Sequence, residues 1–364
     1  MMLVIIQDFL RCGGTEQQSL FLARWLSQNG HQSHVITFRP GGPLARDLQE
    51  SNIPHTPLQK KDRKIDWYAP GLIRQIKKEQ PDLILCMGRM ANCYAGRIQR
   101  KLPETPVIGS MRTGKKLPWL YRKSLKKVRA IIANSLQAKT RLVEQYDIAS
   151  EKITVIRNAI VKISDAKLSS DSRESLRKQY GASPQSLVFI CAAMFRPQKD
   201  HQKLVRLMAK LSLAQDWQLW LIGTGITETE TKELVRKLNL EQRVKFLGYQ
   251  ADPSSFYTAA DIALLTSRSE SLTNFLVEAQ WHGLPIVAER NGGVGECFSP
   301  DKSGFLIEPG CDEDFLQKLN KLMSDTKLRQ LFSEVALQYS RKEFSSHRQC
   351  QRHLELFTQL LNKS

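Results

Sequence analysis

The sequence lacks the features that mark several whole classes of protein. No apolar run approaches the roughly 20 residues that a membrane-spanning helix needs. The apolar start at residues 2–6 is too short for the core of a signal peptide and has no basic leader. We therefore expect the protein to stay in the cytosol. With 364 residues, 41% of them hydrophobic, the chain is expected to fold as a globular protein of two domains.

Cysteine is scarce and follows no ligand pattern. None of the seven cysteines forms a C-x-x-C pair, and no cluster of His and Cys has the spacing of a zinc site. An odd number also argues against a closed disulfide framework, so we interpret the cysteines as reduced and mostly buried thiols. The G-x-x-x-x-G-K-[ST] loop of nucleotide hydrolases is missing as well.

Acidic residues are scarce in the first part of the chain. Residues 1–160 hold 27 Lys and Arg against 12 Asp and Glu, a net charge of +15 out of +18, which leaves +3 for the remainder. A basic excess confined to one half indicates a polyanionic partner: an anionic lipid surface, a nucleic acid or an acidic substrate. No RRM, zinc-finger or basic-zipper signature is present, which argues against nucleic acid.

Two series of strand and helix signals follow one another along the chain. Short apolar runs predict buried strands and amphipathic segments predict helices between them, an alternation that favours parallel sheets wrapped by helices. The polar stretch 162–186 between the two series is interpreted as a linker plus one helix. The apolar runs lie at residues 3–6, 34–38, 82–86, 107–110, 130–133 and 153–156, and again at 187–193, 217–222, 244–247, 262–266, 285–288 and 305–307.

The predicted fold is therefore α/β, with two Rossmann-like domains whose parallel sheets face a central cleft. The first domain is expected to span residues 1–160 and the second 161–344, with a last helix, within 345–364, that packs back on the first domain. Ligands of such sheets bind outside the carboxyl ends of the strands. Both domains are thus expected to contribute to one site.

Two carboxylates stand eight residues apart in the strongest motif. Glu270 is predicted in the loop after a strand, and Glu278 about one turn into the following helix. Between them, backbone N–H groups at the helix N-terminus can hold a diphosphate, and a carboxylate can accept hydrogen bonds from both hydroxyls of a ribose. An isolated pair of this kind is more often a pair of solvated helix charges, so the surrounding sequence decides.

The surrounding sequence resembles the C-terminal domain of the family 4 glycosyltransferases, retaining enzymes of the GT-B fold. The Glu-x7-Glu-Ala motif at 270–279 continues into the Gly-x-Pro strand segment at 283–288, the Gly-Gly turn with Glu at 291–296 and the Gly-hydrophobic strand at 303–307. Order and spacing agree throughout, and weaker similarity covers most of residues 1–310. The chain is similar to bacterial lipopolysaccharide and polysaccharide glycosyltransferases.

The resemblance implies roles for residues of the second domain. Lys199 and Arg196 would bind the diphosphate of a nucleotide-sugar donor and neutralise the leaving group. The family's usual Arg lies five residues before the Lys, where this chain has Met194, so Lys199 is the stronger candidate. Glu278 would hold the ribose, and Glu270, counted with Lys199 and Arg196 as catalytic, would hold the sugar. The other donor-binding candidates are Thr273, Asn274, Phe275 and Gly223.

In the first domain the resemblance implies a loop for phosphate and acceptor. The family has a Gly-Gly-x-Glu loop after the first strand, where glycines let the backbone approach a ligand closely, although a lone Gly-Gly is also a common plain turn. Many relatives have a His in this domain at the place where this chain has Arg112. A guanidinium does not act as a general base, so this arginine is expected to bind the sugar or an acidic acceptor. The candidates are Gly13, Gly14, Glu16, Arg89 and Arg112.

A dense basic stretch that includes aromatic residues lies at 112–129. Eight of its 18 residues are Lys or Arg. Basic and aromatic side chains together suit an anionic membrane interface, whereas a solvated helix whose Leu and Trp face the core is the structural alternative. The residues expected at the membrane are Lys115, Lys116, Trp119, Arg122, Lys123, Lys126 and Lys127.

Taken together, the resemblance implies a retaining hexosyltransferase that needs no metal and no cofactor beyond its nucleotide-sugar co-substrate. The expected acceptor is lipid-linked or a lipopolysaccharide or polysaccharide, and the protein is expected as a peripheral protein on the inner face of the cytoplasmic membrane. Two alternatives stay open. One is a non-catalytic protein of the same fold that binds a nucleotide sugar or glycan, and the other is a nucleotide-sugar epimerase.

Overall fold

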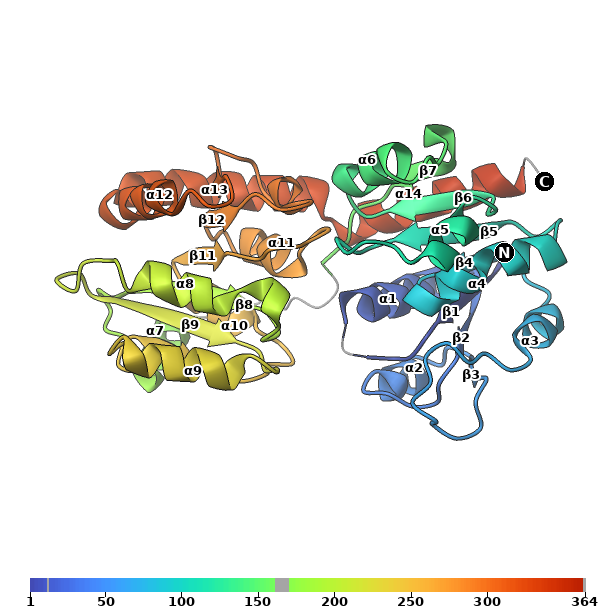
Figure 1. Ribbon diagram of the computed structural model, residues 1–364, viewed down its shortest axis with the longest axis horizontal. Helices are drawn as coiled ribbons and strands as arrows, with labels where there is room; N and C mark the ends of the chain where they lie inside the picture. The colour runs from blue at the N-terminus through green and yellow to red at the C-terminus, as the bar shows by residue number, and fades with distance from the viewer. Residues whose placement is uncertain (12, 161–169, 363–364) are drawn as a thin grey trace. The chain divides into compact units, whose positions relative to one another are not determined.

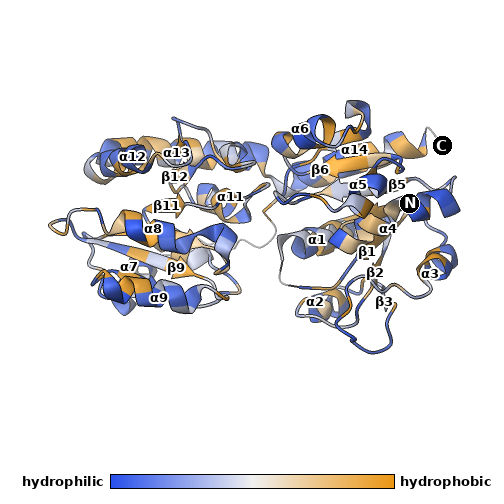
Figure 2. Ribbon diagram, in the orientation of Figure 1, coloured by the Kyte–Doolittle hydropathy of each residue, from blue (hydrophilic) through white to orange (hydrophobic). Residues whose placement is uncertain are grey.

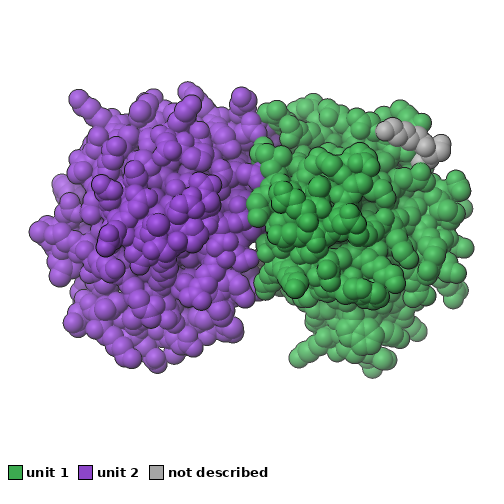
Figure 3. Space-filling model, turned by 45° about the horizontal axis from the view of Figure 1, so that its top comes forward, with its two compact units in different colours: residues 1–161, 346–364 green, residues 162–345 purple. Residues whose placement is uncertain are grey.

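The structure is a computed structural model that describes residues 1–11, 13–160 and 170–362. The chain divides into two units, one of residues 1–161 with 346–364 and the other of residues 162–345, which Figure 3 colours separately. Each unit has its own sheet (Figure 1). Of the stretch interpreted as linker plus helix, residues 162–169 lie outside the described part of the chain, and α7 (Ser170–Gln179) is the helix.

The first unit is built on a seven-stranded parallel sheet of order β3-β2-β1-β4-β5-β6-β7. The strands are β1 (Met2–Gln7), β2 (Gln32–Thr37), β3 (His55–Pro57), β4 (Leu83–Cys86), β5 (Val107–Met111), β6 (Ala130–Ala133) and β7 (Ile153–Val155). The sequence did not predict β3, which is short and polar. The helices are α1 (Gly14–Gln28), α2 (Ala45–Glu50), α3 (Leu72–Glu79), α4 (Arg89–Lys101), α5 (Trp119–Leu125), α6 (Leu136–Glu144) and α14 (Ser346–Leu361).

Alternating residues of the central strands supply the cores on the two faces of this sheet. Val4 and Ile6 pack with buried residues of α3 to α6, whereas Leu3 and Ile5 pack with α1, α2 and α14. Figure 2 shows the strands in hydrophobic colours between helices of mixed polarity. The last helix of the chain therefore packs on the first unit.

The second unit holds a six-stranded parallel sheet of order β10-β9-β8-β11-β12-β13. The strands are β8 (Leu187–Ala192), β9 (Trp217–Ile222), β10 (Val244–Phe246), β11 (Ile262–Leu265), β12 (Ile286–Glu289) and β13 (Gly304–Ile307). The helices besides α7 are α8 (His201–Met208), α9 (Glu228–Lys237), α10 (Ser254–Ala259), α11 (Asn274–Trp281), α12 (Asp312–Ser324) and α13 (Thr326–Glu343). Both sheets are entirely parallel, as the strand and helix alternation predicted.

The strand order reverses at one place in each sheet. In the first unit the chain leaves β1 toward β2 on one side, and β4 lies on the other; in the second, β8 and β11 form the same arrangement. Such switch points are where open parallel sheets bind ligands. The loops that follow β1, β4, β8 and β11 are therefore the places to look for a site.

The described cysteines largely fit their interpretation as buried thiols. Five are free and buried, whereas Cys311 is free and exposed, and Cys12 lies outside the described residues. Burial raises the pKa of the Cys191 thiol to about 12. A thiol with so high a pKa stays protonated at neutral pH and is a poor nucleophile.

Candidate functional site

Two loops at the switch point of the second unit are joined by an ion pair. The turn at Pro197–Lys199 follows β8, and the loop that holds Glu270 follows β11. Lys199 Nζ lies 2.5 Å from Glu270 Oε1, and the two side chains are only 22% and 9% exposed. In such surroundings two charges attract more strongly than on an exposed surface. The structure thus brings together two of the residues predicted as catalytic.

Backbone and side-chain hydrogen bonds fix the turn that carries Lys199. The backbone N–H of Arg268 donates to the carbonyl oxygen of Gln198 at 2.8 Å. The Arg268 guanidinium Nε donates to Asp200 Oδ2 at 2.6 Å. The loop before Glu270 therefore holds the lysine turn from both sides. The sequence reasoning missed Arg268, although its place three residues after β11 was a usable signal.

The N-terminus of α11 faces the same loop. Thr273 is its N-cap residue and makes no capping hydrogen bond with its side chain, so the first turn, beginning at Asn274, is not capped by that residue. Phe275 is buried and packs on Tyr257 with ring centroids 6.1 Å apart, which anchors the helix. A helix N-terminus of this kind suits a diphosphate, because its N–H groups and dipole favour negative charge.

Close backbone approach requires glycine where β9 ends. Gly223 has φ +131°, and a Cβ there would collide with the carbonyl of Ala193. The loop after β9 thus lies directly against the loop after β8. Arg196, in contrast, is exposed.

Glu278 is a half-buried residue of α11. Its Oε2 accepts a hydrogen bond of 2.8 Å from the Tyr257 hydroxyl. Burial raises the pKa of Glu278 to about 7, and the Tyr257 hydrogen bond only partly offsets this. Among the described residues no Lys or Arg forms an ion pair with it. A buried carboxyl that lacks a cation is well suited to accept hydrogen bonds from ligand hydroxyls.

A pocket of about 340 Å³ lies at the switch point of the first unit. Three of the predicted acceptor residues, Glu16, Arg89 and Arg112, line it, and so do Lys115 and Lys116, which were predicted at the membrane. Gly13 is the N-cap of α1 and Gly14 its first residue, so both shape the loop beside the pocket. The pocket therefore collects most of the candidates of this unit.

Asp8, which the sequence reasoning missed, lies in this pocket directly after β1. Its Oδ2 accepts from the backbone N–H of Met90 at 2.9 Å and its Oδ1 from that of Ala91 at 2.8 Å. The carboxylate thus caps the N-terminus of α4. Burial nevertheless raises the pKa of Asp8 to about 6. An acidic residue at the end of a buried apolar strand was the signal that could have found it.

Arg112 is enclosed in the wall of the pocket. Its Nη2 donates a hydrogen bond to Asn158 Oδ1, while Nε and Nη1 are buried without a hydrogen-bond partner in the described part of the chain. Burial lowers the pKa of Arg112 to about 10, so the side chain is still a cation at neutral pH. This is consistent with its expected role as a binding residue and not a base.

The basic stretch after Arg112 divides between several surroundings. Lys115 and Lys116 line the pocket. Lys126 pairs with the exposed Asp147 at 2.8 Å, and Arg122 lies over the Tyr146 ring. The residues expected at the membrane therefore lie in different surroundings, because a short helix sends its side chains in different directions.

Three of those seven residues line a separate groove of about 590 Å³ between α4 and α5. Trp119 is 63% exposed there, with Lys123 Nζ 4.7 Å from its ring centroid. Lys127 belongs to the same groove, and Trp67 faces it from the loop before α3. Trp119 therefore does not face the core, contrary to the structural alternative. Leu117 and Tyr121 do face the core. We call this feature the aromatic–basic groove; its lining residues are Trp67, Met90, Cys93, Tyr94, Gly96, Arg97, Arg100, Trp119, Leu120, Lys123, Ser124 and Lys127.

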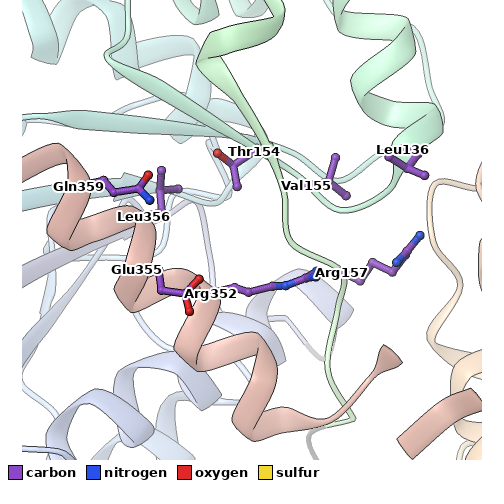
Figure 4. A pocket seen from close by; sticks show the side chains of 8 residues that line it. All are labelled: Leu136, Thr154, Val155, Arg157, Arg352, Glu355, Leu356 and Gln359. Carbon is purple, nitrogen blue, oxygen red and sulfur yellow. The ribbon is translucent and has the colours of Figure 1, made fainter. Parts of the chain in front are cut away.

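A further hollow of about 400 Å³ lies beside α14 (Figure 4). Arg352, Glu355, Leu356 and Gln359 come from that helix, and Thr154, Val155 and Arg157 come from β7 and the segment after it. It contains none of the predicted site residues and lies at the sheet edge, away from the switch point. We assign it no part in the site.

Two features are absent from the part of the chain that the structure describes. No helix there is long and apolar enough to cross a membrane. Nor do three or more His, Cys, Asp or Glu side chains come together there as a metal site. Independence from metal and from cofactors stays a prediction.

Comparison with known proteins agrees with this arrangement. The family profile described as "Glycosyltransferase Family 4" matches residues 12–161, and "Glycosyl transferases group 1" matches residues 172–339. The first profile falls within the first unit and the second profile within the second unit. Together they match most of the chain. The chain belongs to the family 4 glycosyltransferases.

The chain is similar in sequence to several named relatives. It is 31% identical over 173 residues to N-acetyl-alpha-D-glucosaminyl L-malate synthase of Bacillus anthracis, covering 48% of this chain and 45% of that one. It is 25% identical over 207 residues to N-acetylgalactosamine-N,N'-diacetylbacillosaminyl-diphospho-undecaprenol 4-alpha-N-acetylgalactosaminyltransferase of Campylobacter jejuni, covering 57% and 54%. The chain thus matches about half the length of these curated relatives.

The similarity to solved structures covers nearly the whole of this chain. The structure of Anabaena Alr3699/HepE in complex with UDP has a TM-score of 0.85 at 22% identity, over 98% of this chain and 99% of that one. At this identity the likeness establishes the fold. The predicted GT-B class, with two parallel-sheet α/β domains, is confirmed.

The raised pKa of Glu278 predicts how the stability of this protein depends on pH. The folded protein, with a pKa of about 7, keeps a proton that the unfolded chain loses near 4.5, so stability falls as pH rises through that window. The full loss is about 3 kcal/mol. We expect Glu278→Gln to melt a few degrees above wild type at pH 8, and the gap to close toward pH 4.5. Thermal melts across this range measure it; a less stable variant at pH 8 would contradict the buried-carboxyl account.

Proposed function

We propose that the protein transfers a sugar from a nucleotide diphosphate sugar to an acceptor, with retention of configuration and without a metal ion. The observation that carries the proposal is the Lys199–Glu270 ion pair of 2.5 Å beside the N-terminus of α11, with Glu278 half-buried on that helix. These groups match, one for one, what a nucleotide sugar presents: a diphosphate, a sugar with hydroxyls and a ribose.

The proposed donor geometry follows from the chemistry of each group. The diphosphate would lie between Lys199 and the N–H groups of Asn274 and Phe275, because positive charge and the N-terminus of a helix meet there. Glu278 would accept hydrogen bonds from the ribose hydroxyls, and Glu270 from the sugar. The Anabaena protein of the same fold has a solved structure in complex with UDP, which supports a nucleotide donor here.

Bond cleavage in this proposal depends on electrostatic stabilisation. As the glycosidic bond to phosphate breaks, negative charge grows on the departing diphosphate oxygen, where Lys199 and the helix N-terminus neutralise it. That oxygen can take the proton of the acceptor hydroxyl on the same face of the sugar, so no protein nucleophile is needed. Glu270 then positions the sugar. Its ion pair with Lys199 keeps both side chains in place before the donor binds.

An incubation with labelled donors tests the proposed function. Purified protein is given UDP-, GDP- and ADP-sugars together with a lipid extract of bacterial membranes, and labelled glycolipid is extracted and counted. We expect transfer from at least one donor in the presence of EDTA and none by Glu270→Ala. Donor binding without any transfer would favour the non-catalytic alternative, and a donor returned as its stereoisomer would favour the epimerase.

The acceptor is proposed to be lipid-linked or of the lipopolysaccharide type, used at the inner face of the cytoplasmic membrane. The Campylobacter relative is named for a diphospho-undecaprenol acceptor. The first part of this chain also carries almost all of the net positive charge. The exposed Trp119 with Lys123 and Lys127 beside it forms the kind of surface that settles at an anionic lipid interface.

Membrane docking predicts binding to anionic vesicles that salt reverses. Wild type should sediment with phosphatidylglycerol vesicles at low salt and detach as screening grows. At about 1 kcal/mol per basic residue near such a surface, Lys123→Glu with Lys127→Glu should weaken binding more than tenfold.

The matched control for docking reverses two exposed lysines of the second unit, Lys302 and Lys327, with the same change in net charge. We expect it to sediment almost as wild type does. Equal loss in both double variants would mean that total charge and not the aromatic–basic groove governs binding. No sedimentation of wild type at low salt would contradict docking itself.

A further inference from the structure

A fully buried phenol contacts the carboxyl that is proposed to hold the ribose. Tyr257, on α10, is 1% exposed, and its hydroxyl donates a hydrogen bond of 2.8 Å to Glu278 Oε2. The other carboxyl oxygen, Oε1, accepts no hydrogen bond from the part of the chain that the structure describes. An ionised carboxylate offers about four lone-pair sites, of which this contact uses one. The remaining sites are left to accept from the hydroxyls of a ligand.

The face of α11 that carries Glu278 determines where the phenol ring lies. Phe275, Glu278 and His282 follow one another at spacings of three and four residues, so their side chains share one face of the helix and its C-cap. The Tyr257 ring packs on the outer two, with its centroid 6.1 Å from that of Phe275 and 5.5 Å from that of His282. The hydroxyl therefore meets the residue between them, which is Glu278.

The helix that carries this phenol is itself fixed at both ends. Asp252 Oδ1 accepts from the first backbone N–H of α10 at 3.0 Å. At the other end, Arg173 Nε donates to the carbonyl oxygen of Thr258 at 3.2 Å, and Arg177 Nε donates to that of Ala259 at 2.9 Å. Both arginines belong to α7, and Arg177 is buried. These bonds satisfy helix-end groups, and they hold the phenol in place before any ligand binds.

The groups around Glu278 make its ionisation dependent on this hydrogen bond. Burial raises the pKa of Glu278 to about 7, although the Tyr257 hydrogen bond lowers it, and the negative charge of Asp252 raises it further. The other titratable groups that face the pair are Cys191 of β8 and His282. No lysine or arginine of the described residues contributes to this pKa. The phenol is therefore the described group that favours the charged form of the carboxyl.

We propose that Tyr257 is a positioning residue of the nucleotide site, whose hydroxyl holds the Glu278 carboxylate in the orientation that accepts both hydroxyls of a ribose. The inference rests on the proposed function, in which Glu278 binds the ribose of the donor. Fixing a glutamate side chain in advance removes an entropic cost that binding would otherwise carry. The ionised carboxylate is also the stronger acceptor. Tyr257 thus adds to the preference for ribose over 2′-deoxyribose without contacting the ligand.

Calorimetric titration with a matched pair of nucleotides tests this role. The probes are whichever of UDP, GDP and ADP binds most tightly and its 2′-deoxy counterpart, and the ratio of their dissociation constants measures the ribose preference. Titration of the phosphates affects both affinities equally and cancels in the ratio. We expect a preference of about 10- to 100-fold in wild type, the range of a hydrogen bond to a charged group. Tyr257→Phe should retain less than about fivefold at pH 7, with its affinity for the 2′-deoxy nucleotide unchanged.

The pH profile of the ribose preference separates positioning from a structural role. In wild type the preference should rise with pH through about 7, as Glu278 ionises. Loss of the phenol hydroxyl raises the pKa of this carboxyl further, so in Tyr257→Phe the midpoint should move to higher pH. A variant that only destabilised the fold would weaken both nucleotides and leave the midpoint in place. Tyr94→Phe removes a hydroxyl that donates to the Trp67 carbonyl at 2.8 Å, and this matched control should behave as wild type.

A third variant shows which part of the account fails if the results differ. Glu278→Gln is titrated with the same probes and should lose the ribose preference as well. Full preference in Glu278→Gln, or no binding of any of these nucleotides, would overturn the proposed donor site and this inference with it. If Glu278→Gln loses the preference and Tyr257→Phe keeps it, or loses it with an unmoved midpoint, the positioning role alone is overturned.

Discussion

Replacement of Glu270 by Gln should lower turnover by at least about 100-fold while the protein stays folded. The carboxylate is 8% exposed and holds Lys199 at 2.5 Å, at the place where the sugar of the donor is proposed to lie. An amide keeps the shape but removes the charge that accepts from sugar hydroxyls and orients the lysine. Losing an interaction that counts mainly in the transition state lowers kcat more than it changes donor affinity.

The second unit offers a matched control for this variant. Glu289, 6% exposed, pairs with Lys203 much as Glu270 pairs with Lys199, but Lys203 is also shared with Asp312. Glu289→Gln therefore removes a similarly buried carboxylate of an ion pair in the same unit. We expect near-normal turnover from it, measured beside circular dichroism of both variants. Equal activity in the two would contradict the assignment of Glu270.

Replacement of Lys199 by Ala should weaken binding of the nucleoside diphosphate by about 10- to 100-fold. A charge-assisted hydrogen bond to phosphate contributes roughly 1.5–3 kcal/mol, and Lys199 is the cation that the fold holds against the α11 loop. Its turn is fixed by two hydrogen bonds from Arg268, so the loss is of a pre-positioned charge. Turnover should fall further, because the leaving diphosphate gains charge as the bond breaks.

Arg196 is the internal comparison for Lys199. It lies in the same loop but is exposed, and an exposed cation contributes less to binding because water screens it. Arg196→Ala is therefore expected to cost less than about fivefold in nucleotide affinity. Calorimetry on both variants ranks them, and a larger loss in Arg196→Ala would show that this arginine moves onto the phosphate when the donor binds.

Patterns in the sequence predicted the strands of both sheets with few errors, and they pointed to Lys199 and Glu270, which the structure brings together. Continuous apolar runs predict buried parallel strands well, because both faces of such strands are covered. The three-residue strand β3, with half-exposed polar residues, gave no such signal.

Site residues whose role depends on tertiary contacts could not be predicted from the sequence. Tyr257 reaches Glu278 from α10, 21 positions away, and Asp8 caps α4 across 82 positions. No local pattern marks either contact. The basic stretch shows the opposite failure, since a local cluster of charge suggested one surface where the fold distributes Lys115, Lys123 and Lys126 over three surroundings. Linear density of charge does not determine which way side chains point on a short helix.

A crystal structure with bound nucleotide is the measurement that tests the central claim most directly. Wild type is crystallised with whichever of UDP, GDP and ADP binds most tightly by calorimetry. The account predicts the ribose hydroxyls within hydrogen-bond distance of Glu278, and the diphosphate on Lys199 and the first N–H groups of α11. A nucleotide bound in the first-unit pocket, or a diphosphate that leaves Lys199 paired only with Glu270, would contradict it.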